Sequence, residues 1–197
     1  MSAADDRPAG VSEQKARMLA GEPYHAHDPE LQADALRCHR LLERYNTSSP
    51  GALEERASIL AELLGSIGSG VVIRPPLVMD YGYQTSIGSG TFINAGAIIL
   101  DVGRVTIGAQ VQIGPNVQIL TPTHPLDPAV RRTGAEAAKP ITIGDNVWLG
   151  GGVIVCPGVT IGRDTVVGAG AVVVRDLPDG VLAVGNPARV VRTLVSS

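Results

Sequence analysis

His124 is the residue of this chain best suited to acid–base chemistry. It is the one histidine in the C-terminal two thirds of the sequence, because His25, His27 and His39 all lie in the first third. Pro125 follows it directly and confines the backbone of His124 to extended conformations, which could fix the direction of its side chain. An imidazole changes charge near neutral pH and can take the proton of a hydroxyl group that attacks an acyl group. An ordinary surface histidine is the alternative interpretation.

A six-residue repeat predicts the scaffold that carries His124. A six-residue period fits neither a helix nor a long alternating strand, but it fits a short strand of about four residues followed by a corner. Parallel coils of three such steps pair their backbones with the coils above and below, and the aliphatic residues stack inside. The predicted fold is therefore an all-β solenoid, a parallel β-helix of about five coils. The aliphatic residues recur at Ile67, Ile73, Met79, Ile87, Ile93, Ile99, Ile107, Ile113, Ile119, Ile143, Leu149, Val155, Ile161, Val167 and Val173.

The period breaks at three places. The steps from Met79 to Ile87 and from Ile99 to Ile107 are eight residues long, so two extra residues recur at the same corner of successive coils. The step from Ile119 to Ile143 is 24 residues long, which predicts an 18-residue insertion and hence a loop at residues 121–140. His124 lies in this loop, and loops that leave a rigid scaffold often carry function.

Three helices are predicted before the repeat. The first covers residues 12–20, and Asp28 with Pro29 gives the N-cap and first position of the second. Ser49-Pro50 repeats this start signal, with Leu53, Ala57, Leu60 and Leu64 facing inward as far as Gly65.

The chain divides into four parts on this basis. We expect a flexible N-terminus at residues 1–11, a helical segment at residues 12–65, the β-helix at residues 66–183 and a C-terminal tail at residues 184–197. An open solenoid end needs a cap, which is the expected role of the helical segment. A direct role of this segment in substrate binding is the alternative.

Composition excludes several classes of function. Lys and Arg number 16 against 19 Asp and Glu, so the net charge of -3 gives no field that would attract nucleic acid. We find no apolar run of about 18 residues and no apolar leader at the N-terminus, which predicts a cytoplasmic protein without a membrane partner. A metal-dependent hydratase would need about three histidines. The repeat region has one, so we expect no metal.

Several motifs resemble the maltose and galactoside O-acetyltransferase family over about residues 13–193. They are the lead segment at residues 15–24, Asp80-Tyr81-Gly82-Tyr83, Thr123-His124-Pro125, the run at residues 140–148 and Gly185-Asn186-Pro187-Ala188-Arg189. The resemblance implies a left-handed β-helix and a homotrimer with active sites between subunits. It also implies acetyl transfer from acetyl-CoA, as co-substrate, to a sugar hydroxyl of the maltose, glucose or galactoside type.

The resemblance also assigns roles to particular residues. His124 matches the catalytic general base, and Glu136 matches a glutamate near that base that could orient it or support its charge. We expect direct transfer without a covalent acyl-enzyme, with an oxyanion donor such as a backbone N–H of the Gly150-Gly151-Gly152 run. A solvated loop carboxylate is the alternative for Glu136.

The remaining assignments concern the two substrates. The alternatives are ordinary corner residues for the acceptor positions, a solvated face for the C-terminal pair of arginines and a packing role for the tryptophan. The positions that match acceptor contacts are Asp80, Asn94 and Asp101; those that match contacts to acetyl-CoA are Gly151, Ala169, Val174, Arg175, Arg189 and Arg192; and Trp148 is expected to wall the site or the subunit interface.

Departures from the family pattern leave the acceptor open. Ala26 stands where galactoside acetyltransferases use an acidic contact, Gly96 replaces a frequent Asn, and Val102 and Val174 replace polar contacts. An O-acetyltransferase for an antibiotic or an amino-acid hydroxyl is therefore an alternative. A non-catalytic β-helix scaffold is another.

Overall fold

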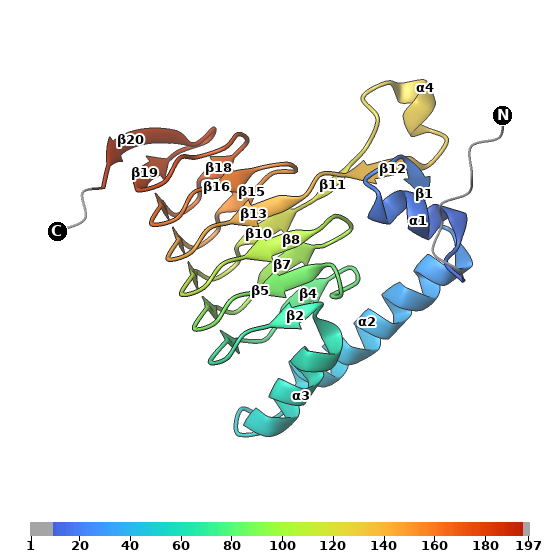
Figure 1. Ribbon diagram of the computed structural model, residues 1–197, viewed down its shortest axis with the longest axis horizontal. Helices are drawn as coiled ribbons and strands as arrows, with labels where there is room; N and C mark the ends of the chain where they lie inside the picture. Colours follow the sequence, from blue (N-terminus) through green and yellow to red (C-terminus); the bar gives the residue numbers. More distant parts are fainter. Residues whose placement is uncertain (1–9, 195–197) are drawn as a thin grey trace.

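Three parallel sheets form the walls of a β-helix in the computed structural model, which describes residues 10–194 (Figure 1). Sheet 1 contains β2 (Ser66–Ile67), β5 (Thr85–Ile87), β8 (Val105–Ile107), β13 (Ile141–Ile143) and β16 (Thr160–Ile161). Sheet 2 contains β3 (Val72–Ile73), β6 (Phe92–Ile93), β9 (Gln112–Ile113), β14 (Trp148–Leu149), β17 (Val166–Val167) and β19 (Val181–Val184). Sheet 3 contains β4 (Leu77–Met79), β7 (Ala97–Leu100), β10 (Gln118–Leu120), β15 (Ile154–Val155) and β18 (Val172–Val173).

The aliphatic repeat is confirmed as the interior of this β-helix. Fourteen of the fifteen repeat residues are buried, and Ile67, at the first coil, is half-buried. They pair in register between coils, as Ile87 does with Ile107 and Ile107 with Ile143. The structure has five complete coils and, after them, an incomplete sixth formed by a bridge at Leu177 and by β19, against the prediction of about five.

The corner after sheet 1 depends on a residue with a positive φ, three positions after the interior aliphatic residue. At the corner after sheet 1, φ lies between 55° and 70° in every coil from Gly70 through Gln110 and Asn146 to Gly180. The left-handed region is costly for most residues, which explains the Gly, Asn and Asp found here. The residue directly after the aliphatic one must be small for a different reason. A Cβ on Gly88 would lie 2.5 Å from the backbone nitrogen of Ala109 in the next coil.

The first two N-terminal helices begin close to their predicted starts, and the third does not. α1 (Glu13–Leu19) starts after Ser12, and α2 (Pro29–Thr47) starts after Asp28, whose side chain accepts hydrogen bonds from two backbone N–H groups. α3 (Leu53–Leu63) begins later than the Ser49-Pro50 signal predicts.

The predicted inward face of α3 was also wrong in part. Leu60 and Leu64 are buried as predicted, but Leu53 is 70% exposed and Ala57 is exposed, whereas Ile59 and Leu63 are buried. The helix turns this second face inward because α2 and the first coil offer an apolar surface there, which sequence spacing alone did not show.

α3 and the C-terminal half of α2 cover the first coil. Their buried residues join one core with the interior of the β-helix. Tyr45 donates to the Ile73 carbonyl at 2.6 Å, and Asn46 exchanges two hydrogen bonds with the backbone of Leu77. This packing fits the predicted cap. The N-terminal half of α2 instead rises beside the coils toward the insertion (Figure 1).

The insertion at residues 121–140 projects from the third coil as a hairpin (Figure 1). It contains β11 (Pro122–Thr123), α4 (Pro128–Arg131) and β12 (Ala135–Ala138), and β1 (Tyr24–His25) adds to β12 as a third antiparallel strand. The predicted tail at residues 184–197 includes β20 (Arg189–Thr193), which pairs antiparallel with β19. The predicted flexible N-terminus falls mainly on residues 1–9, outside the described part. None of the helices within residues 10–194 has the length and apolar character that a membrane span requires.

Coil stacking predicts a specific cost for a methyl group at Gly88. Gly88→Ala should lower the free energy of unfolding by about 1–3 kcal/mol, because the added Cβ meets backbone that cannot move without shifting a coil. Gly51→Ala is the matched control, since nothing lies within 4 Å of its Cβ. It should change stability by less than about 0.5 kcal/mol. Urea denaturation measures both, and equal effects would contradict this account.

Candidate active site

A pocket of about 330 Å³ lies where the repeat is broken. Both eight-residue steps fall at the corner after sheet 3, and the 18-residue insertion falls at the same corner one coil later. These enlarged corners stack and create a recess that a regular six-residue step would not leave. Its lining includes Asp80, Tyr81, Leu100, Val102, Pro122, His124 and Glu136, with Ala26, Ala35 and His39 from the N-terminal segment.

His124 and Glu136 face each other across the two strands of the insertion. The Nε2 atom of His124 lies 3.8 Å from Oε2 of Glu136, and the two side chains are 58% and 18% exposed. This distance exceeds that of a hydrogen bond. It still allows the carboxylate to stabilise a protonated imidazole, and catalytic contacts often tighten only when substrate binds. The other oxygen of Glu136 accepts a hydrogen bond from the Tyr24 hydroxyl at 2.5 Å.

Two aspartates lie on the opposite side of the pocket, at different depths. Asp80 lines the pocket and is half-buried. Burial raises the pKa of Asp80 to about 6, and repulsion from Asp101 and Glu136 adds to the effect. Asp101 has no solvent exposure, and its burial raises its pKa. Its carboxylate accepts from Tyr81 N at 2.9 Å and Thr85 Oγ1 at 3.1 Å, so in this structure it holds the corner that carries Tyr81.

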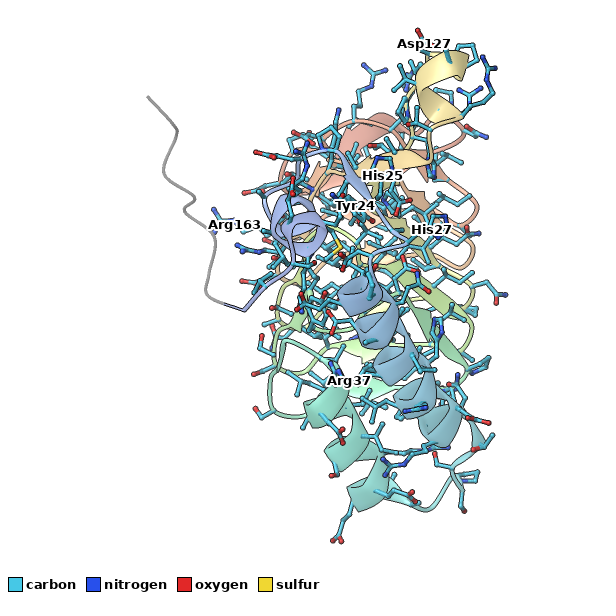
Figure 2. The ribbon with its side chains drawn as sticks, turned by 90° about the vertical axis from the view of Figure 1, so that its right-hand side faces the viewer. Tyr24, His25, His27, Arg37, Asp127 and Arg163 are labelled. Carbon is cyan, nitrogen blue, oxygen red and sulfur yellow. The ribbon has the colours of Figure 1, made fainter. Side chains whose placement is uncertain are left out.

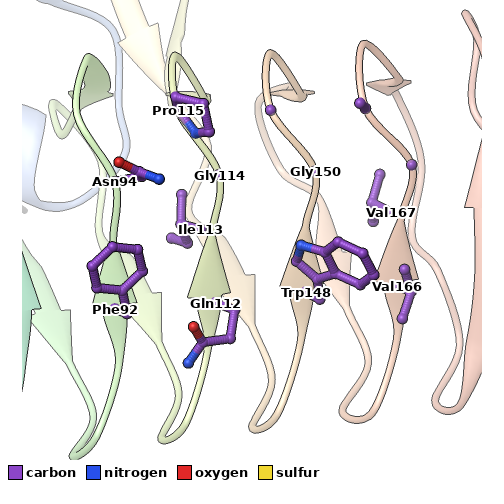
Figure 3. A pocket seen from close by; sticks show the side chains of 13 residues that line it. Phe92, Asn94, Gln112, Ile113, Gly114, Pro115, Trp148, Gly150, Val166 and Val167 are labelled. Carbon is purple, nitrogen blue, oxygen red and sulfur yellow. The ribbon is translucent and has the colours of Figure 1, made fainter.

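A second recess, a groove of about 460 Å³, runs over the outer face of sheet 2 (Figure 3). Trp148, 56% exposed, projects into it, and Asn94, Gly151 and Ala169 line it. A Cβ on Gly151 would lie 3.3 Å from the Pro115 ring, so the small residues leave room for an extended ligand. The lining is mainly apolar, with Phe92 and Val166 beside the tryptophan.

The structure divides the predicted site residues into three groups. His124, Glu136 and Asp80 share the pocket, with Asp101 beneath it. Asn94, Trp148, Gly151 and Ala169 share the groove, and no residue lines both recesses. Val174, Arg175, Arg189 and Arg192 are exposed near the C-terminal end, outside the lining of the groove.

Sequence reasoning missed Tyr81 and His39 in the pocket, and Tyr24, which lies outside the lining and contacts Glu136. Tyr81 follows Asp80 at an enlarged corner, so the eight-residue step could have indicated it. His39 lies on α2 and Tyr24 on β1, and no local pattern shows that these elements reach the insertion.

The scaffold and the recesses together define a hexapeptide-repeat transferase. The sequence matches the bacterial transferase hexapeptide (six repeats) over residues 140–175 and the maltose acetyltransferase hexapeptide capping motif over residues 17–68. It is 51% identical to nodulation protein L of Rhizobium meliloti (strain 1021) over 177 residues, which cover 90% of this chain and 97% of that protein.

Solved structures agree in sequence and fold. A maltose O-acetyltransferase from Clostridium difficile 630 superposes with a TM-score of 0.92 at 42% identity, covering 93% of this chain and 98% of that one. A galactoside acetyltransferase in complex with coenzyme A gives a TM-score of 0.90 at 36% identity, covering 94% and 92%. The chain belongs to the maltose and galactoside O-acetyltransferase family.

The raised pKa of Asp80 predicts a pH-dependent gain in stability for Asp80→Asn. The native state holds a proton on Asp80 up to about pH 6, whereas the unfolded state releases it near pH 3.8. Ionisation of Asp80 in the native state therefore lowers the free energy of unfolding as the pH rises from about 4 to about 6. Above pH 6 this loss of stability is complete. Asp80→Asn should be more stable than wild type by about 1–2 kcal/mol at pH 8, allowing for partial exposure.

Urea denaturation at pH 4 and pH 8 measures this difference, which should nearly vanish at pH 4. Glu62→Gln, at an exposed carboxylate of α3, is the control and should behave like wild type at both values. A gain of the same size at pH 4 and pH 8 would contradict the account.

Proposed function

We propose that the protein transfers the acetyl group of acetyl-CoA to a hydroxyl of a small sugar, with His124 as general base. The observation that carries the proposal is the pairing of His124 with Glu136 at the edge of a polar pocket. Its fold neighbour in complex with coenzyme A supports acetyl-CoA as the donor. The cytoplasmic location expected from the sequence belongs to the same proposal.

The chemistry needs one proton acceptor and one oxyanion donor. His124 takes the hydroxyl proton as the oxygen attacks the thioester carbonyl, and Glu136 stabilises the imidazolium that forms. Collapse of the tetrahedral intermediate expels the thiolate of CoA, which receives the proton from His124. Gly150 N donates to Val167 O and Gly152 N to Pro115 O, so within the glycine run Gly151 N is the candidate oxyanion donor.

The pocket suits a molecule with both hydroxyl and apolar faces. Asp80 can accept hydrogen bonds from acceptor hydroxyls, and Leu100 and Val102 can pack against carbon atoms. Asn94 would add a further contact from the groove. Asp101 would act from below, by holding Tyr81, because its carboxylate is fully buried. Ala26 gives the lead segment an apolar contact, which keeps a non-sugar alcohol as the second candidate acceptor.

The groove suits the extended arm of acetyl-CoA. Gly151 and Ala169 would let pantetheine lie close to the coils, and Trp148 would pack against the thioester end of the ligand. Arg189 and Arg192, with Val174 and Arg175, would lie toward the nucleotide, where guanidinium groups pair well with phosphates.

Separation of the two recesses supports active sites between the subunits of a homotrimer. One chain presents the base and the acceptor pocket at the corner after sheet 3, and the groove on sheet 2. The outer face of sheet 2 carries an apolar column, while that of sheet 1 carries only Ser and Thr. The columns are Val72, Phe92, Gln112, Trp148, Val166 and Leu182 on sheet 2, and Ser66, Ser86, Thr106, Thr142 and Thr160 on sheet 1. The outer column of sheet 3 is similar to that of sheet 2 and consists of Val78, Ile98, Gln118, Ile154 and Val172. Sheets 2 and 3 are thus the faces suited to burial in an assembly.

Replacing the base should abolish transfer and leave donor binding intact. We expect His124→Ala to lower turnover by a factor on the order of 10² to 10⁴. Release of CoA thiol from acetyl-CoA measures this with maltose, glucose, galactosides, serine and chloramphenicol as acceptors, and calorimetry measures acetyl-CoA binding. Turnover near that of wild type would exclude His124 as the base. Absence of both release and acetyl-CoA binding in the wild type would favour the non-catalytic scaffold.

A mixing experiment tests whether two chains build one site. Ala169→Trp should block the groove, and His124→Ala removes the base, so each variant alone should be inactive. In trimers refolded from a 1:1 mixture, about one quarter of the sites would combine an intact groove with an intact base if these come from different chains. CoA release near a quarter of the wild-type rate is expected, with light scattering to confirm a trimer. A mixture as inactive as its components would place both halves in one chain.

A further inference from the structure

We propose that Tyr24 is a positioning residue of the catalytic centre, which acts on His124 through Glu136. The inference rests on the proposed role of His124 as general base. It gives the N-terminal segment a part in catalysis besides capping the β-helix.

The contact between Tyr24 and Glu136 is short and partly buried. The Tyr24 side chain is 1% exposed, and its hydroxyl donates to Oε1 of Glu136 at 2.5 Å. Oε2 of the same carboxylate is the atom that lies 3.8 Å from Nε2 of His124. One oxygen of Glu136 is therefore held by the tyrosine, and the other is left to the imidazole.

Backbone pairing fixes this order of side chains. The three-stranded sheet has the order β1, β12, β11, in which Tyr24 pairs with Glu136 and Thr123 pairs with Ala137. His124 directly follows β11, so the three groups come from neighbouring strands. Figure 2 shows Tyr24 below the projecting insertion, whose tip is marked by Asp127.

The segment that delivers Tyr24 is itself anchored at several points. Lys15 on α1 forms ion pairs of 2.8 Å with Glu30 and with Asp34 on α2. Arg17 Nε donates to the Pro23 carbonyl at 2.6 Å, next to β1. The Tyr24 ring packs in an apolar cluster that includes Met18, Leu31, Tyr81 and Val102. A surface tyrosine would need none of these restraints, whereas a positioning residue does.

The chemistry of the phenol fits a permanent donor. Burial and the hydrogen bond to Glu136 raise the pKa of Tyr24 far above its usual value, so it keeps its proton throughout the working range. Its hydroxyl holds Glu136 in place and withdraws part of its negative charge from the imidazole. Without the hydroxyl, the carboxylate would be free to approach His124, and the protonated imidazole would hold its proton more strongly. This would slow release of the proton to CoA and would leave less of His124 in the free-base form at low pH.

Other ionisable groups face this centre and remain in every variant compared below. Asp80 and Tyr81 lie across the pocket, Asp101 lies beneath it, and His39 faces it from α2. Their contributions are common to wild type and variants, so differences between pH profiles report on Tyr24 and Glu136.

The test compares pH–rate profiles of Tyr24→Phe, Glu136→Gln and the double variant. Tyr24→Phe should lower kcat about 3- to 30-fold with little change in KM for the acceptor, and it should move the acid limb of kcat to higher pH by about half a unit. Glu136→Gln should move that limb to lower pH. The double variant should match Glu136→Gln, because the tyrosine has no carboxylate left to act on.

Tyr45→Phe is the matched control. Tyr45 is also 1% exposed and donates a hydrogen bond of 2.6 Å, but to the backbone carbonyl of Ile73, away from the pocket. Its loss should reduce thermal stability and leave the acid limb where it is in wild type. If Tyr24→Phe does not fold, Tyr24→Met removes the same donor and carries the same expectation.

Two results would overturn the proposal. One is an acid limb for Tyr24→Phe that coincides with that of wild type. The other is a double variant whose losses multiply, as those of independent residues do. His124→Ala in the same assay distinguishes failure of the proposed base from failure of the proposed role of Tyr24. An active His124→Ala removes the proposed base, whereas an inactive one with an unshifted Tyr24→Phe profile removes only the role of Tyr24.

Discussion

The alignment of each coil with the one below it is the constraint from which the rest of the structure follows. Backbone hydrogen bonds between coils hold only if every coil returns to the same register, so the interior residue must be aliphatic and of similar size at every step. The same requirement places a left-handed residue at the corner after sheet 1 in every coil and leaves no space for a Cβ at Gly88. Freedom to vary is confined to the corners and to the outer faces.

The proposed active-site residues lie at the corners where the repeat varies. Two extra residues at one corner, repeated in successive coils and followed by an insertion in the third, create the pocket. Its most deeply placed carboxylate, Asp101, serves the corner itself, while Asp80 is held near the surface of the pocket at an electrostatic cost. The N-terminal segment completes the pocket from outside the repeat. The proposed catalytic centre therefore lies at departures from the regularity that makes the fold stable.

Local signals in the sequence predicted most of this architecture and only part of the site. The repeat, the insertion, the first helix and the cap at Asp28 follow from residue spacing and type, and all are present. The start of α3 and its buried face depend on what it packs against, so spacing misplaced them. The pairing of β1 with β12 joins residues 112 positions apart and leaves no local trace. Handedness and the trimer stay predictions, because neither follows from a six-residue period.

The antiparallel return of β20 has a consequence for the ends of the molecule. A parallel solenoid contains nothing that limits its own length, since each coil presents to the next the same unpaired edge that it covers in the previous one. Such an edge invites end-to-end growth into fibres. On sheet 2, β20 reverses the chain direction and lays Arg189 and Arg192 along the last edge, and at the other end α3 covers the first coil. Protection against end-to-end association thus lies in the two terminal segments, and a repeat longer or shorter by whole coils would leave it in place.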